Sequence, residues 1–296
     1  MLAATLAALA LGCGGGRSVP RPALAPAPPK PAVPPEQGCA EGDLAACNTL
    51  GERALAGPEA THDRRRARQM FERACEGDYA VACFNLATLE RTGLDTSRVT
   101  ASFARACTGG HAEACHERAE ISAAAYSSAT EAVAATRYFE LACDGGYLPS
   151  CYALSVRLQR GEGCEVDGAR ATSIMVEACE GDYSAACTAV GSIFQDGNAY
   201  VKADKPRAAA AYRRACDGDG KLGCYFLASM LQDGDGVSVD KAAAAAAYAL
   251  ACDAWNHMAC LNLGKMYEAG DGVIANPTRA TELFKRACDA GNVTAC

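Results

Sequence analysis

Sixteen of the chain's 18 cysteines fall into eight pairs, and the two members of each pair stand eight positions apart. The pairs recur every 32 to 37 residues, which is the period of helical repeat proteins. Their positions are Cys39 and Cys47, Cys75 and Cys83, Cys107 and Cys115, Cys143 and Cys151, Cys179 and Cys187, Cys216 and Cys224, Cys252 and Cys260, and Cys288 and Cys296. Such a pattern predicts a stack of short repeated units rather than one large core.

The residues on both sides of each cysteine pair are spaced as in helices. Four positions before the first cysteine of seven pairs stands a large residue: Phe71, Phe103, Phe139, Met175, Tyr212, Tyr248 or Phe284. This spacing of four predicts a helix that ends at the cysteine. Four positions after the second cysteine stands a small residue, namely Gly51, Ala87, Ala119, Ser155, Gly191, Ala228 or Gly264. A second helix, whose backbone can be approached closely, is therefore predicted to begin there, with glycine-rich turns such as 234–241 joining it to the next helix.

The stretches CLNLGKMYEAGDGV (260–273) and ATELFKRAC (280–288) resemble the Sel-1-like repeat, and in particular its cysteine-rich branch of secreted bacterial proteins. The resemblance covers residues 39–296. It implies an all-α fold, a right-handed, tetratricopeptide-like α-solenoid of about seven antiparallel helix hairpins. Residues 115–143 depart from the pattern because they lack its Gly-x-Gly turn, and the second unit is four residues short.

The cysteines could be bridged locally, across the turn between consecutive hairpins, or within a hairpin. Within-hairpin separations vary from 24 to 29 residues and would leave Cys39 and Cys296 without partners. Local pairing leaves none unpaired, and the resemblance implies the same connectivity. We therefore predict eight local disulfides, with Cys296 closing the first turn of an unbuilt helix and no helix preceding Cys39. So many disulfides indicate an oxidising compartment.

The sequence offers few candidate residues for metal binding or catalysis. The cysteine spacing does not suit zinc, so no metal and no cofactor are predicted. His111 and His116 are expected to be surface histidines, and Cys164 a buried small hydrophobe in a turn where other repeats have valine. Ser238-Val239-Asp240-Lys241 matches the S-x-x-K motif of serine β-lactamases, but its companion motifs are missing from the chain. The resemblance carries β-lactam binding or weak hydrolysis as an alternative function.

The N-terminus predicts export. Residues 1–13 form an apolar run that is too short to span a bilayer and ends at Leu-Gly-Cys, like a bacterial lipobox with Cys13 as the lipidated residue. Ala10 and the lack of a preceding Lys or Arg depart from that pattern. Residues 14–37 are rich in proline and alanine and predict a tether, followed by the repeats at 38–296. A lipoprotein of the cell envelope, in the outer membrane and facing the periplasm or the surface, is expected.

Function is therefore predicted to reside on a surface. The net charge of -7 and the scattered basic residues argue against nucleic acid as a partner. Two positions past the second cysteine, Asn85 and Asn262 are candidates for hydrogen-bonding the backbone of an extended peptide, as related repeats do. We expect a scaffold that binds a protein, a peptide or a cell-wall component, with a membrane contact only through the lipid, and we do not expect an enzyme.

Overall fold

The structure, a computed structural model, describes residues 33–56, 60–91, 96–124 and 128–296. Contacts divide the chain into Met1–Pro34 and Pro35–Cys296, and every described helix lies in the second unit. The predicted signal peptide, Cys13 and most of the predicted tether lie outside the described residues. The first helix begins at Pro35, inside the stretch predicted as tether.

Secondary structure in the described residues is helical throughout. Fifteen α-helices and one 3-10 helix follow one another: α1 (Pro35–Ala40), α2 (Leu44–Leu55), α3 (Ala60–Glu76), α4 (Ala80–Glu90), α5 (Thr96–Thr108), α6 (Ala112–Ala124), α7 (Ala129–Asp144), α8 (Leu148–Arg160), α9 (Gly168–Glu180), α10 (Ser184–Asp196), α11 (Lys205–Asp217), α12 (Lys221–Asp233), α13 (Lys241–Asp253), α14 (His257–Ala269), α15 (Pro277–Asp289) and η1 (Val293–Ala295).

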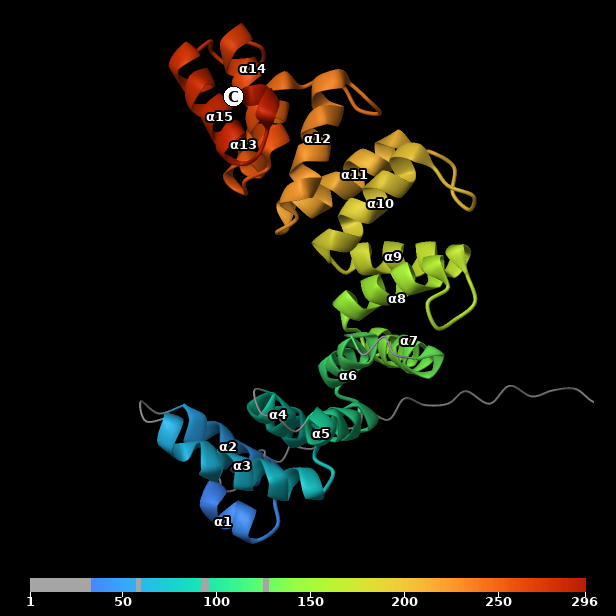
Figure 1. The fold of residues 1–296 in the computed structure, drawn as a ribbon, viewed down its shortest axis with the longest axis vertical. Helices are drawn as coiled ribbons and strands as arrows, with labels where there is room; N and C mark the ends of the chain where they lie inside the picture. Colours follow the sequence, from blue (N-terminus) through green and yellow to red (C-terminus); the bar gives the residue numbers. More distant parts are fainter. Residues whose placement is uncertain (1–32, 57–59, 92–95, 125–127) are drawn as a thin grey trace, which may run out of the picture. The chain divides into compact units, whose positions relative to one another are not determined.

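Each helix packs on its neighbours in the chain. The pairs α2/α3, α4/α5, α6/α7, α8/α9, α10/α11, α12/α13 and α14/α15 form hairpins, and the odd-numbered helix of each of the first six hairpins also packs on the next even-numbered helix. Figure 1 shows this succession from α2 in blue to α15 in red. The predicted all-α solenoid is confirmed, because contacts join adjacent units instead of converging on one centre.

The predicted stripe of the odd-numbered helices forms the core. The alanines that precede the first cysteines are buried, and so are the large residues four positions before those cysteines, except Phe284. In α15 the neighbouring Leu283 is buried and Phe284 is half-buried. The large residue of the stripe is therefore less covered in the last helix than in the earlier ones.

Small residues on the even-numbered helices make room for aromatic rings. A Cβ on Gly51 would lie 2.4 Å from the Phe71 ring, and a Cβ on Gly264 would lie 2.5 Å from the Phe284 ring. The close approach predicted from these small residues is thus made by a ring of the same hairpin.

Eight disulfides staple the turns. Each joins cysteines eight apart, the connectivity predicted above, with Cα–Cα distances from 4.4 Å at Cys179–Cys187 to 5.0 Å at Cys288–Cys296. The expectation that no helix precedes Cys39 is wrong, because α1 carries that cysteine. At the other end Cys296 directly follows η1.

The glycine-rich turns pack against the preceding hairpin and form ion pairs with it. Gly236 has a φ of +75°, and a Cβ there would lie 2.4 Å from the Cβ of Lys205 at the start of α11. The aspartate before it, Asp235, accepts a hydrogen bond from Lys205 Nζ at 2.5 Å. Asp271 and Lys241 repeat this contact one unit later, at 2.7 Å. The turn sequence therefore fixes one hairpin against the next.

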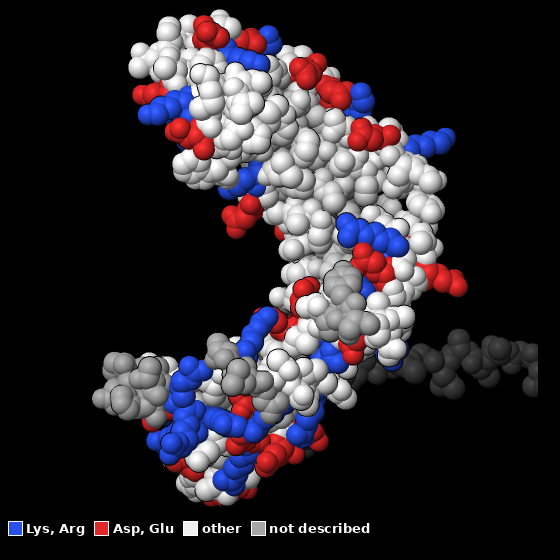
Figure 2. Space-filling view, in the orientation of Figure 1, with Lys and Arg blue, Asp and Glu red and all other residues white. Residues whose placement is uncertain are grey.

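Charge is unevenly distributed over the surface. Arg64, Arg65, Arg66 and Arg68 are exposed on α3, and Figure 2 shows basic side chains gathered over α2 and α3. This cluster departs from the scattered distribution expected from the sequence. No helix in the described part of the chain is both long and apolar enough to cross a bilayer.

Candidate functional site

The two asparagines proposed as peptide contacts have partners inside the chain. Asn85 Nδ2 donates to Asn48 Oδ1 at 2.9 Å and to Glu52 Oε1 at 3.3 Å, which ties α4 to α2. Asn262 is half-buried and hydrogen-bonded to the Tyr248 hydroxyl. Either amide would have to exchange an internal bond to bind a ligand.

The histidines are not the solvated surface residues that were predicted. Both are half-buried because aromatic rings cover them. His111 stacks on Phe84 with ring centroids 4.3 Å apart, and its Nδ1 accepts from the backbone N–H of Ala114. Burial lowers the pKa of His111. His116 Nδ1 lies 2.8 Å from Ser150 Oγ, and its ring packs on Tyr147.

These ring contacts repeat along the even-numbered helices. Each joins the residue after the second cysteine of one pair to the residue four positions before the second cysteine of the next pair. We call the space between these two positions a slot. Three consecutive slots are filled by Phe84 with His111 at 4.3 Å, His116 with Tyr147 at 5.0 Å, and Tyr152 with Tyr183 at 5.9 Å.

The next slot, between α10 and α12, holds no ring of its own. Its two positions are Thr188 and Gly220, and a cavity of about 860 Å³ opens there. Tyr183 and Phe226 both line it, and Leu222, which is 51% exposed, lies at its rim. Pockets of several hundred cubic ångströms that are lined mostly by apolar groups are the usual form of a ligand site.

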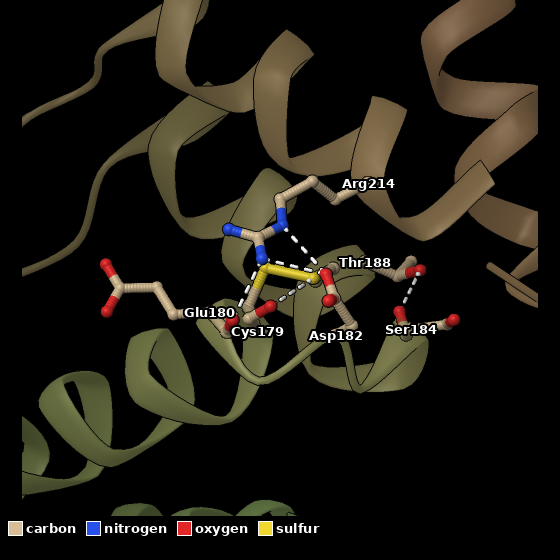
Figure 3. The surroundings of a disulfide bond; sticks show 7 residues. Cys179, Glu180, Asp182, Ser184, Thr188 and Arg214 are labelled. Atoms are coloured by element: carbon tan, nitrogen blue, oxygen red, sulfur yellow. Dashed lines mark hydrogen bonds and ion pairs between the residues drawn. A yellow bond between two sulfur atoms is a disulfide. The ribbon is translucent and has the colours of Figure 1, made fainter. Parts of the chain in front are cut away.

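The floor of this cavity adjoins a stapled turn. Figure 3 shows Ser184 and Thr188 beside the Cys179–Cys187 disulfide, with Thr188 Oγ1 donating to the Ser184 carbonyl at 3.0 Å. Arg214 crosses from α11 and donates to Asp182 at 2.8 Å and to the Glu180 carbonyl at 2.9 Å. The Asp182 carboxylate is therefore already paired and the turn beneath the cavity is held in place.

A second, smaller cavity of about 390 Å³ lies beside the first. Tyr152 and Tyr183 line both cavities, so this pair of rings separates them as a ridge. The smaller cavity is also lined by His116, Glu120 and Arg157. The two cavities adjoin along residues of α6, α8, α10 and α12, and we call them together the groove.

Arg157 is a charged residue that sequence reasoning missed. Its side chain is 7% exposed, and its guanidinium donates to Thr136 Oγ1 at 2.8 Å and to the Ala132 carbonyl at 2.9 Å. A weaker ion pair with Glu162 spans 3.3 Å. Because these partners satisfy the buried charge, Arg157 supports the wall of the smaller cavity instead of offering a free cation.

The S-x-x-K segment forms no nucleophilic pair. Ser238 is exposed in the turn after α12, Asp240 caps α13 by accepting from the Ala243 N–H, and Lys241 Nζ donates to Asp271. An ammonium engaged by a carboxylate is a poor general base. The segment is thus an ordinary repeat turn.

Cys164, which was predicted to be a buried small hydrophobe, is half-buried. It packs against the cluster that contains Phe139 and Leu158, and burial raises the pKa of its thiol. A raised pKa lowers the thiolate fraction and hence the reactivity. In the described residues, no group of three or more His, Cys, Asp or Glu side chains is placed to hold a metal ion.

Comparisons with known proteins agree with this geometry. The family model described as Sel1 repeat matches residues 44–79, 132–147, 148–183, 184–219, 221–254 and 257–292, which is more than half of the chain. The unmatched stretch between 79 and 132 contains the units whose sequences depart from the pattern. A search of curated proteins found no match.

Solved structures show the same fold. The Escherichia coli protein c5321, described as a protective antigen with an SLR fold, superposes with a TM-score of 0.81 at 23% identity. The match covers 88% of this chain and 56% of that one. A Sel1 repeat protein from Oxalobacter formigenes superposes with a TM-score of 0.61 at 21% identity, covering 88% and 87% of the two chains.

Proposed function

The chain belongs to the Sel1 repeat family, and from that membership we propose that it is a scaffold that binds an extended segment of a partner protein in the groove over α6, α8, α10 and α12. Helical repeats present continuous surfaces of this kind, and they serve protein–protein interaction. A peptide or a cell-wall component with the same extended form would use the same groove.

The single observation that supports this function is the ridge shared by the two cavities. Tyr152 and Tyr183 stand between spaces of about 390 and 860 Å³. In an extended peptide, successive side chains point to opposite sides, and alternate ones are about 7 Å apart. Such a segment can cross the ridge with one side chain in each cavity.

The compartment follows from the cysteines. Eight disulfides indicate an oxidising, extracytoplasmic location. We further propose that residues 1–13 direct export, that a lipid on Cys13 anchors the chain in the outer membrane, and that residues 14–37 tether the repeats beyond it. The support for this part is the Leu-Gly-Cys sequence at 11–13 and the proline-rich stretch that follows it.

Site-specific photocrosslinking in the envelope tests the proposed surface. A photoreactive residue at Ala185, which is exposed at the larger cavity, should crosslink a discrete partner. The same residue at Ile274, which is 91% exposed in the turn between α14 and α15, is the matched control and should not. Equal products at both positions, or a partner captured only at Ile274, would refute the groove as the binding surface.

Fractionation tests the anchor separately. The wild-type chain, expressed in a bacterium from a start that supports export, should be recovered with the membranes, and Cys13→Ser should release it. Recovery of both proteins in the soluble fraction would refute the lipid anchor while leaving the binding surface in place.

A further inference from the structure

We propose that the empty slot between α10 and α12 receives one aromatic side chain of the bound segment, so that the ligand adds a ring next to the three slots that hold ring pairs. This inference rests on the proposed function and names the chemistry that the groove selects. Free aromatic molecules and other side chains are the competing occupants.

The three preceding slots show what this space accommodates. In three consecutive slots the chain itself supplies two rings in contact, at 4.3, 5.0 and 5.9 Å between centroids. The slot formed by Thr188 and Gly220 has the same helix-to-helix position but contains only a methyl, a hydroxyl and a hydrogen. Both rings that fill each of the three preceding slots are therefore absent from this one.

The turn between α11 and α12 explains why the chain cannot fill this slot. In the other seven stapled turns, the third residue after the first cysteine has a positive φ, but its counterpart here, Asp219, does not. The backbone takes another path and packs on α10: a Cβ on Gly220 would lie 2.9 Å from Ser184 Cβ and 2.7 Å from the Ala215 carbonyl oxygen. A larger residue at 220 would collide with the first turn of α10, so the opening is built into the backbone.

The walls of the cavity are rings held in fixed positions. Phe226 stacks on the buried Tyr212 at 5.0 Å and meets Tyr225 edge-on at 5.4 Å. Tyr183, which also lines the cavity, packs on Tyr152. A ring that enters the cavity therefore has two aromatic side chains in its lining, Tyr183 and Phe226, and offset-stacked and edge-to-face contacts between rings are favoured.

The polar groups at the mouth favour a peptide over a free hydrocarbon. Lys221 is half-buried, and its ammonium has no hydrogen-bond or ion-pair partner in the described part of the chain. An ammonium only donates hydrogen bonds, so it matches a backbone carbonyl or a carboxylate next to the inserted ring. Asp182, on the other side of the mouth, is already paired with Arg214.

The test uses the full chain with its disulfides intact and three pentapeptides, acetyl-Gly-Gly-X-Gly-Gly-amide, with X as phenylalanine, leucine or alanine. Binding is measured by saturation-transfer NMR with titration. We expect the phenylalanine peptide to bind at least about tenfold more tightly than the alanine peptide, with leucine between them. Equal binding of all three peptides would overturn the inference, and so would tighter binding of leucine or of free phenylalanine.

Two variants locate the binding. Thr188→Phe places a ring of the chain itself in the slot, as Tyr152 does one unit earlier. This variant should bind the phenylalanine peptide at least about tenfold more weakly than the wild-type chain does. Thr281→Phe is the matched control, because Thr281 is exposed on α15 and makes the same hydroxyl-to-carbonyl bond four residues back. Leu222→Ala, at the exposed rim, should weaken binding even if Thr188→Phe fails to fold. Unchanged binding in the rim variant, or in folded Thr188→Phe, would overturn the inference.

The two proposals fail in different ways. A partner crosslinked at Ala185 together with peptides that show no aromatic preference would leave the binding surface standing and refute the ring site. Selective binding of the phenylalanine peptide to wild type and to Thr281→Phe, with loss in Thr188→Phe, is the result that supports it.

Discussion

Gly191 of α10 lies directly against the ring of Tyr212 in α11: a Cβ on the glycine would stand 2.4 Å from Cε1 of the tyrosine. The Tyr212 hydroxyl donates to Gln195 Oε1 at 2.9 Å, so the ring is held at both ends. In this hairpin the ring therefore occupies the place of a Cβ on residue 191, and a side chain there would have to displace the ring.

Gly191→Ala should lower the free energy of unfolding by about 1–3 kcal/mol, the usual cost of overpacking a fixed core. The measurement is denaturant unfolding followed by circular dichroism. Lys265→Ala, at an exposed position of α14, is the control and should change stability by less than about 0.5 kcal/mol.

A second substitution should partly rescue that variant. In the hairpin of α8 and α9 the same two positions hold Ser155 and Met175, so a flexible methionine there faces a residue that has a side chain, although in three other hairpins an alanine (Ala87, Ala119 or Ala228) faces a ring. The double variant Gly191→Ala, Tyr212→Met should therefore lose less free energy of unfolding than the sum of the losses in the two single variants. Strict additivity would show that the two side chains do not meet.

His111 should make stability depend on pH below neutrality. Burial lowers the pKa of His111 in the folded chain below its ordinary value of 6.5, and Glu113 opposes this shift in part. As the pH falls below 6.5, the unfolded chain takes up a proton that the folded chain resists, so stability present above 6.5 is lost towards the folded pKa. His111→Asn keeps an acceptor at the start of α6 but cannot titrate. Unfolding free energies measured from pH 5 to 8 should fall less steeply for this variant, and parallel curves would contradict the assignment.

Ser238 should have no catalytic role. Because Lys241 is bound to Asp271, a chromogenic β-lactam should show no turnover that Ser238→Ala removes. A clear rate in the wild-type chain that disappears in this variant would establish an enzyme and overturn the scaffold.

Cys296→Ser should act locally. Opening the ring closed by Cys288–Cys296 removes stabilisation on the order of 2.5 kcal/mol in the chain-entropy estimate. Since each unit contacts only its neighbours, hydrogen exchange should rise mainly in α15 and η1. A uniform rise back to α2 would mean that the solenoid opens as one cooperative body.

Most of the fold could be predicted from the periodicity of the sequence. The spacing of the cysteines and of Phe71, Phe103 and their equivalents predicted the hairpins and their buried stripes, because a helix places every fourth residue on one face. α1 was missed because its one turn around Cys39 is too short to show a period. The partial exposure of Phe284 was missed because the pattern of the earlier units was extended to α15.

The candidate site was hidden for a different reason. Each slot is formed by residues of two repeats, and alignment on the cysteines places Thr188 and Gly220 in separate columns that look merely small. These two residues form a cavity only because the backbone of the turn at 217–221 takes a different path from the other turns. The sequence of this turn, DGDGK, does not predict that path. Asn85 was predicted to contact a bound peptide. Its hydrogen bond to Asn48 could not be predicted, because that bond depends on the packing of α4 on α2.

The local pairing of the cysteines, on which the turns and the slots depend, is tested most directly by a non-reducing proteolytic digest analysed by mass spectrometry. Linked peptides should join Cys39 to Cys47 and Cys288 to Cys296, with the six intervening pairs linked in the same way and Cys164 free. Peptides that join Cys47 to Cys75 or Cys260 to Cys288 would place the bridges within the hairpins and contradict the structure described above.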